Sequence, residues 1–202
     1  VNLKGGRGDT ISITGDHLCQ SGTCPTGFSA ADSVNFTNGS VTSGASIWTH
    51  TSIPSIVIPA TATDGNLNIT SNTSYISDNL TYDIKFAPSQ PINASPAGEG
   101  GVSLNPLLNA SVFSDGTDGD GHIDSQWQID EEGTFSAPEW SETLALANIS
   151  VVVNDVNGSF ANNLAGQTSL ACGKTYYFRA PYQDNGGVSS QEWSSWSTSS
   201  SF

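Results

Sequence analysis

Basic residues are scarce in this sequence. The 202 residues include 5 Lys and Arg against 19 Asp and Glu, which gives a net charge of −14. Binding to nucleic acid or to an anionic membrane requires clustered Lys and Arg, so the composition argues against both partners. No apolar run approaches the length that spans a bilayer, which argues against membrane insertion in this segment. No signal peptide is recognisable, so we expect a mature chain or a piece excised from a longer protein.

The patterns that mark common catalytic sites are also missing. No Gly-rich phosphate loop is followed by Lys, and neither His50 nor His122 has a nucleophile elbow to work with. Glycosidase chemistry needs two carboxyl groups about 5–10 Å apart in a cleft. Asp130, Glu131, Glu132 and Glu139 offer carboxyl groups, but we expect them on an exposed turn. The sequence therefore predicts that the protein is not an enzyme.

Cysteine is rare, with 3 residues in the chain. Cys19 and Cys24 enclose a short Gly-containing loop that can close a disulfide. Zinc is the competing interpretation, but His17 is the only further ligand nearby. Cys172 is left over, and we expect a buried small apolar residue there, with an intermolecular bridge as the alternative.

Ser, Thr, Asn and Gly dominate the polar residues, as is typical of extracellular β-proteins. The sequence holds nine Asn-X-Ser/Thr sequons, which indicate a glycosylated surface protein unless they are an accident of composition. The sequon asparagines are Asn35, Asn38, Asn68, Asn72, Asn79, Asn93, Asn109, Asn148 and Asn157.

Short stretches that alternate apolar and polar residues fill the first 86 positions. Examples are residues 11–15 (ISITG), 65–70 (GNLNIT) and 80–86 (LTYDIKF). A period of two predicts strands, and the regular turns between them predict a β-sandwich. Together with residues 34–36 (VNF) and 47–52 (IWTHTS), these stretches resemble an IPT/TIG domain, an immunoglobulin-like module of surface receptors and transcription factors.

The beginning of this first module departs from that family. Only four residues precede Gly5 and Gly6, so the first strand is predicted to be short or missing. Either this sequence cuts the strand off, or a neighbouring chain supplies it by strand addition, which would cover an exposed edge. Residues 87–96 hold three prolines and are predicted to be a stiff linker between residues 1–86 and a second module at residues 97–202.

The second module also reads as strands. Residues 125–130 (SQWQID) place Trp127 and Ile129 on one face, and Trp127 is the expected core tryptophan. Residues 170–182, followed by Trp-Ser-Ser-Trp-Ser, resemble the closing strands of a fibronectin type III-like module of microbial surface proteins. The resemblances imply an all-β chain of two tandem immunoglobulin-like and fibronectin III-like β-sandwiches.

The last stretch of the chain carries the densest group of aromatic residues. Residues 176–182 alternate as a strand, and residues 184–187 (DNGG) form a turn. Trp193 and Trp196 are three residues apart, so they lie side by side in an extended conformation. We expect the Arg179 guanidinium to sit over their rings and to close the second sandwich.

Residues 115–124 form an acidic, Gly-rich loop with four carboxylates. Asp115, Asp118, Asp120 and Asp124 make a candidate calcium site, because Ca²⁺ takes six to eight oxygens from a backbone that can bend around it. The spacing departs from the helix–loop–helix calcium pattern, because Trp127 stands where that pattern has Glu. A solvated acidic loop without an ion remains the other interpretation.

Taken together, the sequence predicts an extracellular, glycosylated structural protein without catalytic activity. It would be a subunit or repeat of a cell-surface layer, stalk or filament, and its partners would be copies of itself or neighbouring surface-protein modules. The alternative is an adhesin or carbohydrate-binding accessory module that binds glycans. That alternative draws on Trp48 and Trp140, on the acidic loop and on the Arg7-Gly8-Asp9 triplet, although core packing and a structural turn are expected to account for the tryptophans and the triplet.

Overall fold

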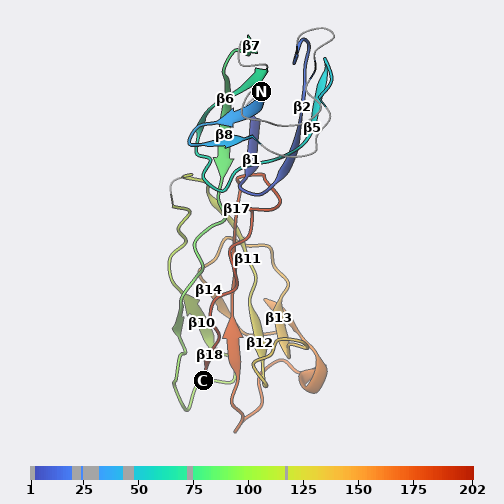
Figure 1. Cartoon of the computed structure of the whole chain (residues 1–202). Helices are drawn as coiled ribbons and strands as arrows, with labels where there is room; N and C mark the ends of the chain where they lie inside the picture. The colour runs from blue at the N-terminus through green and yellow to red at the C-terminus, as the bar shows by residue number, and fades with distance from the viewer. Residues whose placement is uncertain (1–2, 20–23, 25–31, 43–47, 72–74, 117) are drawn as a thin grey trace. The chain divides into compact units, whose positions relative to one another are not determined.

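The computed structural model describes residues 3–19, 24, 32–42, 48–71, 75–116 and 118–202 (Figure 1). The chain divides into two compact units, Val1–Phe86 and Ala87–Phe202. Strands and loops make up both units, and the described residues add only a short 3-10 helix, η1 (Asn162–Leu164). The all-β class is therefore confirmed. Within the described residues, no helix is long and apolar enough to cross a bilayer.

The first unit contains a larger sheet and a two-stranded one. The larger sheet has the order β1-β8-β6-β3-β4, with β7 paired to β6. Its strands are β1 (Leu3–Gly6), β3 (Ser33–Phe36), β4 (Gly39–Val41), β6 (Gly65–Ser71), β7 (Tyr75–Ile76) and β8 (Leu80–Lys85). The smaller sheet pairs β2 (Thr10–Thr14) with β5 (Ser52–Val57) in antiparallel register.

The alternating pattern of the sequence produces the core of this unit. In β6 and β8, every second side chain is buried, which places Leu67, Ile69, Tyr82 and Ile84 inside. Isoleucines from β5 and the residues after it, together with Trp48 at 2% exposure, join the same cluster. The two sheets therefore enclose one apolar layer, as a sandwich requires.

The first strand is present and short, which is one of the two possibilities that the sequence left open. β1 is four residues long and pairs in parallel with β8, from Leu3 opposite Tyr82 to Gly6 opposite Lys85. Gly5 is buried, and a Cβ there would lie 2.5 Å from the Tyr82 hydroxyl oxygen. Glycine is what permits this close approach. A strand from another chain is thus not needed at this position.

The second unit contains three sheets. A three-stranded sheet, β14-β10-β9, and a five-stranded sheet, β15-β13-β12-β16-β18, supply the residues of one core, and β11 pairs with β17 separately. The strands are β9 (Asn93–Ser95), β10 (Leu107–Ala110), β11 (His122–Ser125), β12 (Gln128–Asp130), β13 (Trp140–Glu142), β14 (Ser150–Val152), β15 (Gly158–Phe160), β16 (Tyr177–Arg179), β17 (Tyr182–Asp184) and β18 (Ser200–Ser201).

Large aromatic side chains fill the second core. Trp127, Trp140, Phe178 and Tyr182 are each 0% exposed. Trp127 was the tryptophan that the sequence placed in the core, and this prediction is confirmed. Ala180 and Pro181 separate β16 from β17, because proline has no N–H with which to continue the hydrogen-bond ladder.

Residues 87–96 belong to the second unit and are not a free linker. β9 lies within this segment and pairs with β10, and the Ser89 N–H donates to the Ser114 carbonyl at 2.7 Å. The Asn93 amide donates to the carbonyls of Phe178 and Thr198. The three prolines lie outside β9, which is an edge strand of its sheet, and the stiffness of the segment stays a prediction.

Candidate functional site

The acidic loop between β10 and β11 brings three carboxylates together. Asp115, Asp118 and Asp120 each offer an oxygen, and these oxygens lie within 4.8 Å of one another. Asp115 is 7% exposed, and its Oδ2 accepts the Asp120 N–H at 2.9 Å. Gly116 and Gly119 have positive φ, at 59° and 70°, which lets so short a loop fold back on itself.

A fourth carboxylate reaches the loop from the far end of β17. A Cβ on Gly186 would lie 2.7 Å from Asp120 Oδ2 and 3.0 Å from Asp184 Oδ1, so both carboxylates close over this glycine. Asn185 fixes the approach: its Oδ1 accepts the Gly121 N–H at 2.7 Å, and its N–H donates to the Gly121 carbonyl at 3.1 Å. Sequence reasoning missed Asp184 because it lies far from the loop along the chain.

Asp184 is 2% exposed and only partly satisfied. Its Oδ1 accepts the Gly186 N–H at 2.7 Å, whereas its buried Oδ2 has no hydrogen-bond partner among the described residues. Burial, together with the negative charges of Asp115, Asp120 and Glu192, raises the pKa of Asp184 to about 6, although the hydrogen bond from the Gly186 N–H opposes this shift. The group supplies oxygen donors only, which suits a hard cation.

The sequence predicted that Asp124 lies with these carboxylates, but the structure places it elsewhere. Asp124 lies on β11, two residues beyond the start of the strand, and its Oδ1 accepts the Ser125 N–H at 2.7 Å. Two residues of strand carry a side chain about 6–7 Å along the sheet. Asp124 therefore lies outside the group that gathers Asp115, Asp118 and Asp120.

A second acidic group consists of Asp130, Glu132 and Glu139, and only Glu132 is exposed as the sequence predicted. Asp130 and Glu139 are 0% and 2% exposed. Asp130 Oδ1 accepts the N–H groups of Glu132 and Gly133, and Glu139 Oε2 accepts the Glu131 N–H, each at 2.7 Å. Burial raises the pKa of Glu139. These carboxylates hold the β12–β13 turn.

The His122 ring contacts a serine, but the serine is not an accessible nucleophile. His122 Nε2 lies 2.8 Å from Ser125 Oγ and 2.9 Å from the Asp124 carbonyl oxygen. Ser125 is 1% exposed, and its hydroxyl donates to the Asn148 carbonyl. Burial lowers the pKa of His122, whose ring stacks on Phe113 at 4.7 Å between centroids.

The clasp at the end of the chain differs in one partner from the prediction. The Arg179 Cζ lies 4.0 Å from the Trp196 ring centroid and 4.2 Å from that of Phe135. Among the described residues, Phe135 thus takes the place that the sequence gave to Trp193. Phe135 comes from the β12–β13 turn, where its φ is 56°. Arg179 also donates twice to Gln128 Oε1.

The serines of Trp-Ser-Ser-Trp-Ser fasten the last segment to the strand beside it. The hydroxyl oxygens of Ser194 and Ser197 accept the N–H groups of Tyr182 and Ala180, each at 2.9 Å. The backbone N–H groups of the same serines donate back to the Tyr182 and Ala180 carbonyls. The serine hydroxyl groups of the motif therefore take the place of backbone carbonyls in the pairing with residues 180–182, where Ala180 and Pro181 separate β16 from β17.

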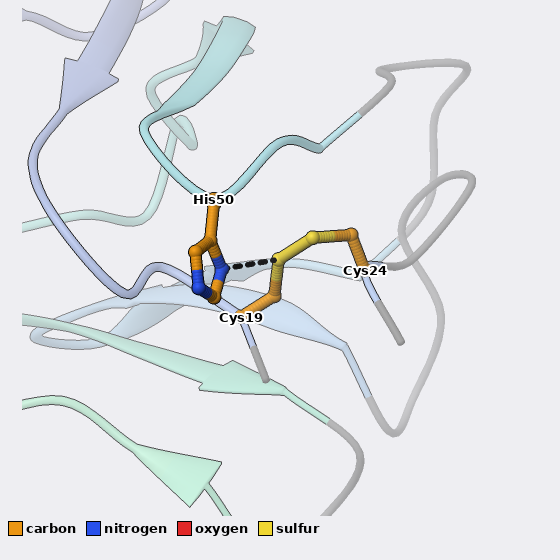
Figure 2. A group of neighbouring side chains, drawn as sticks. All are labelled: Cys19, Cys24 and His50. Carbon is orange, nitrogen blue, oxygen red and sulfur yellow. Dashed lines mark hydrogen bonds between the residues drawn. A yellow bond between two sulfur atoms is a disulfide. The ribbon is translucent and has the colours of Figure 1, made fainter. Parts of the chain in front are cut away.

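The cysteines in the first unit form the predicted disulfide (Figure 2). Cys19 is buried, and its Sγ lies 3.7 Å from His50 Nδ1. Because both sulfurs are bonded to each other, they offer no thiolate to zinc. His17 lies beside His50, with ring centroids 5.2 Å apart. In the second unit, Cys172 is exposed, which corrects the expectation that it is buried.

The Arg7-Gly8-Asp9 triplet is a structural turn. Arg7 Nε donates to the Ala62 carbonyl at 2.9 Å, and its guanidinium lies 4.6 Å from the Phe86 ring centroid. Asp9 Oδ2 accepts the Gly6 N–H at 2.8 Å, and Gly8 has a φ of 86°. Both charged side chains are therefore engaged with their own unit.

The sequon asparagines differ in how free their side chains are. Asn38 and Asn79 are exposed. The Asn35 Nδ2 donates to both Asn68 and Thr70, and the Asn93 Nδ2 donates to two carbonyls, so neither amide has a hydrogen to spare. Asn38, Asn68, Asn109, Asn148 and Asn157 each donate one such bond, and Asn72 lies outside the described residues.

Comparisons with known proteins add two similar structures. The chain is similar to the fibronectin(III)-like modules of CbhA from Clostridium thermocellum, with a TM-score of 0.37 and 13% identity over 99% of this chain and 86% of that chain. It is also similar to a DUF3823 family protein from Bacteroides uniformis, with a TM-score of 0.33 and 11% identity over 96% and 99% of the two chains.

Neither a protein-family model nor a curated protein sequence matches the chain. Both structural TM-scores are low, so the description of each unit as a sandwich rests on its own sheets and core. The resemblance of residues 1–86 to an IPT/TIG domain stays a prediction.

Proposed function

We propose that the chain is a non-catalytic structural part of an extracellular protein, a subunit or repeat of a cell-surface layer, stalk or filament. Copies would join through addition of a β-strand at the open side of the first sandwich. The Cys19–Cys24 disulfide supports the extracellular setting, since disulfides persist in oxidising compartments. The observation that carries the assembly is an apolar groove between two sheet edges.

This groove lies where the larger sheet and the smaller sheet of the first unit both end. It has a volume of about 230 Å³ and is lined by residues of β1, β2, β6 and β8, among them Leu3, Ile13, Leu80 and Tyr82. Leu3 and Leu80 are 39% and 47% exposed at its rim. Among the described strands, β1 is the last of its sheet and β2 pairs with β5 alone, so no described strand lies beyond either of them.

An extended segment of another copy is the occupant that fits this groove. It would pair its backbone with one open edge and bury alternate apolar side chains on the groove floor. The two-stranded β2–β5 sheet would gain a third strand, and sheets of two strands are marginal on their own. Strand addition therefore serves both the assembly and the smaller sheet.

A lysine at the rim tests the assembly. Leu80→Lys places a charge over the groove, and we expect at least a tenfold weaker self-association in light scattering or sedimentation. Leu146→Lys is the matched control, because Leu146 is 49% exposed in a loop of the second unit. Monodisperse monomers at every concentration that bind glycans would contradict this proposal and favour an adhesin or carbohydrate-binding module.

That second candidate has little support from the tryptophans. Trp48 and Trp140 are 2% and 0% exposed, so neither ring face is offered to a sugar.

Glycosylation is part of the proposal and differs among the sequons. A glycan replaces one hydrogen on Nδ2, so we expect hexose mass on peptides that contain Asn38 or Asn79. We expect bare asparagine at Asn35 and Asn93, where both amide hydrogens are already donated. Mass spectrometry of native material from the source organism measures both. Glycans on Asn35 and Asn93 with Asn38 and Asn79 bare would contradict this assignment.

A further inference from the structure

Asp184 has a buried carboxylate oxygen without a hydrogen-bond partner among the described residues. The residue is 2% exposed, and the oxygen concerned is its Oδ2. Burying a carboxylate oxygen without a partner is costly. Asp120 lies against the same glycine, Gly186, Asp115 and Asp118 lie beside Asp120, and the negative charges of Asp115 and Asp120 add to that cost. A bound cation would remove both penalties.

The donor set identifies the class of cation. The four side chains supply only carboxylate oxygens, and the loop between them bends at Gly116 and Gly119. Calcium takes six to eight oxygens in flexible geometry, whereas magnesium demands a near-ideal octahedron and zinc prefers nitrogen and sulfur. A candidate nitrogen ligand, His122, lies opposite Asp184 in the β11–β17 ladder, but its Nε2 is engaged with Ser125 and the Asp124 carbonyl.

We propose that Asp115, Asp118, Asp120 and Asp184 bind a calcium ion that joins the loop before β11 to the turn after β17. The ion would take the role of a cross-link between segments more than 60 residues apart in the sequence. It would hold β17 in register with β11, which already pair through His122 opposite Asp184. The segment with Trp193 and Trp196 begins just after this turn, so the ion also stabilises the closing clasp.

Calorimetric titration and thermal unfolding of the whole chain test this site. After removal of divalent cations with chelator, we expect Ca²⁺ to bind with a stoichiometry of one and to raise the melting temperature by several degrees. The same concentration of Mg²⁺ should raise it much less. Absence of both binding heat and a melting shift in the wild-type chain would overturn the proposal.

Matched variants separate this site from the one that the sequence predicted. Asp184→Asn keeps an oxygen for the Gly186 N–H but removes the charge, and we expect a loss of calcium affinity of more than tenfold. Asp118→Asn is a second variant in the loop, in case Asp184→Asn does not fold. Asp124→Asn and Glu132→Gln should keep the full calcium-dependent shift. Retention of the shift in Asp184→Asn with its loss in Asp124→Asn would refute the ligand set.

Discussion

Glu142 is a carboxyl group whose surroundings disfavour its charge. It lies on β13, where its Oε1 accepts the Asn148 amide at 2.9 Å and its buried Oε2 has no hydrogen-bond partner among the described residues. Burial raises the pKa of Glu142 to about 7, Asn148 opposes this shift, and the charge of Asp124 adds to it. The folded state therefore binds this proton more tightly than the unfolded chain does.

The sign of the pH dependence follows from this difference. Between the ordinary value of 4.5 and about 7, the folded state holds more protons, so the free energy of unfolding falls as pH rises. Glu142→Gln should flatten this slope and stabilise the protein above pH 7 by about 1 kcal/mol, after allowance for solvent screening. Urea unfolding between pH 5 and 8 measures it, with the exposed Glu99→Gln as control. An unchanged slope in Glu142→Gln would contradict this account.

Single residues were predicted well where the signal was local. The Cys19–Cys24 pair and the core Trp127 could be read from spacing and alternation, and both are confirmed. Phe135 and Asp184 were missed for a common reason. Phe135 joins its group from a turn and Asp184 from the end of a strand, each far away in the sequence, and pattern reasoning cannot pair such segments before the sheets are known.

The pairing of β13 with β15 depends on one glycine. Gly158 lies opposite Glu142, and a Cβ there would lie 2.4 Å from the Trp140 ring and 2.5 Å from the Ser141 carbonyl oxygen. Trp140 cannot move aside easily, because it is fully buried and its Nε1 donates to the Asn154 carbonyl. Protein interiors are packed too densely to absorb such an overlap.

Gly158→Ala should therefore destabilise the second unit. Overpacking of a filled core costs roughly 1–3 kcal/mol, which lowers the melting temperature by several degrees. Gly100→Ala is the control, since a Cβ at Gly100 meets nothing within 4 Å. Scanning calorimetry of both variants measures the difference, and equal melting temperatures would refute the packing argument.

Elements were predictable when they alternated and were long enough to see. β6 and β8 follow the period of two, and their buried positions are those that the alternation indicates. β1 was uncertain because Leu-Lys-Gly-Gly carries no alternation, and its strand state comes from parallel pairing with β8. Likewise, three prolines in residues 87–96 suggested a linker, although β9 forms where its partner β10 is available.

At the scale of the whole molecule, the charge of −14 is spread over two sandwiches with few basic residues. Arg7 and Arg179 are engaged with neighbours in their own units, and Lys85 and Lys174 pair with Asp83 and Glu131. Repulsion between copies at this charge must be offset by specific contacts or by cations. The proposed strand addition would supply specific contacts, and the proposed calcium binding would supply cations.

Amide hydrogen exchange across a concentration series tests the proposed assembly most directly. We expect the backbone amides of β1 and β2 to exchange more slowly once the protein self-associates, because an added strand would take up their open edges. Amides of β13 and β15, inside the second unit, should exchange at the same rate throughout. Unchanged exchange in β1 and β2 at concentrations where copies are associated would contradict strand addition at this groove.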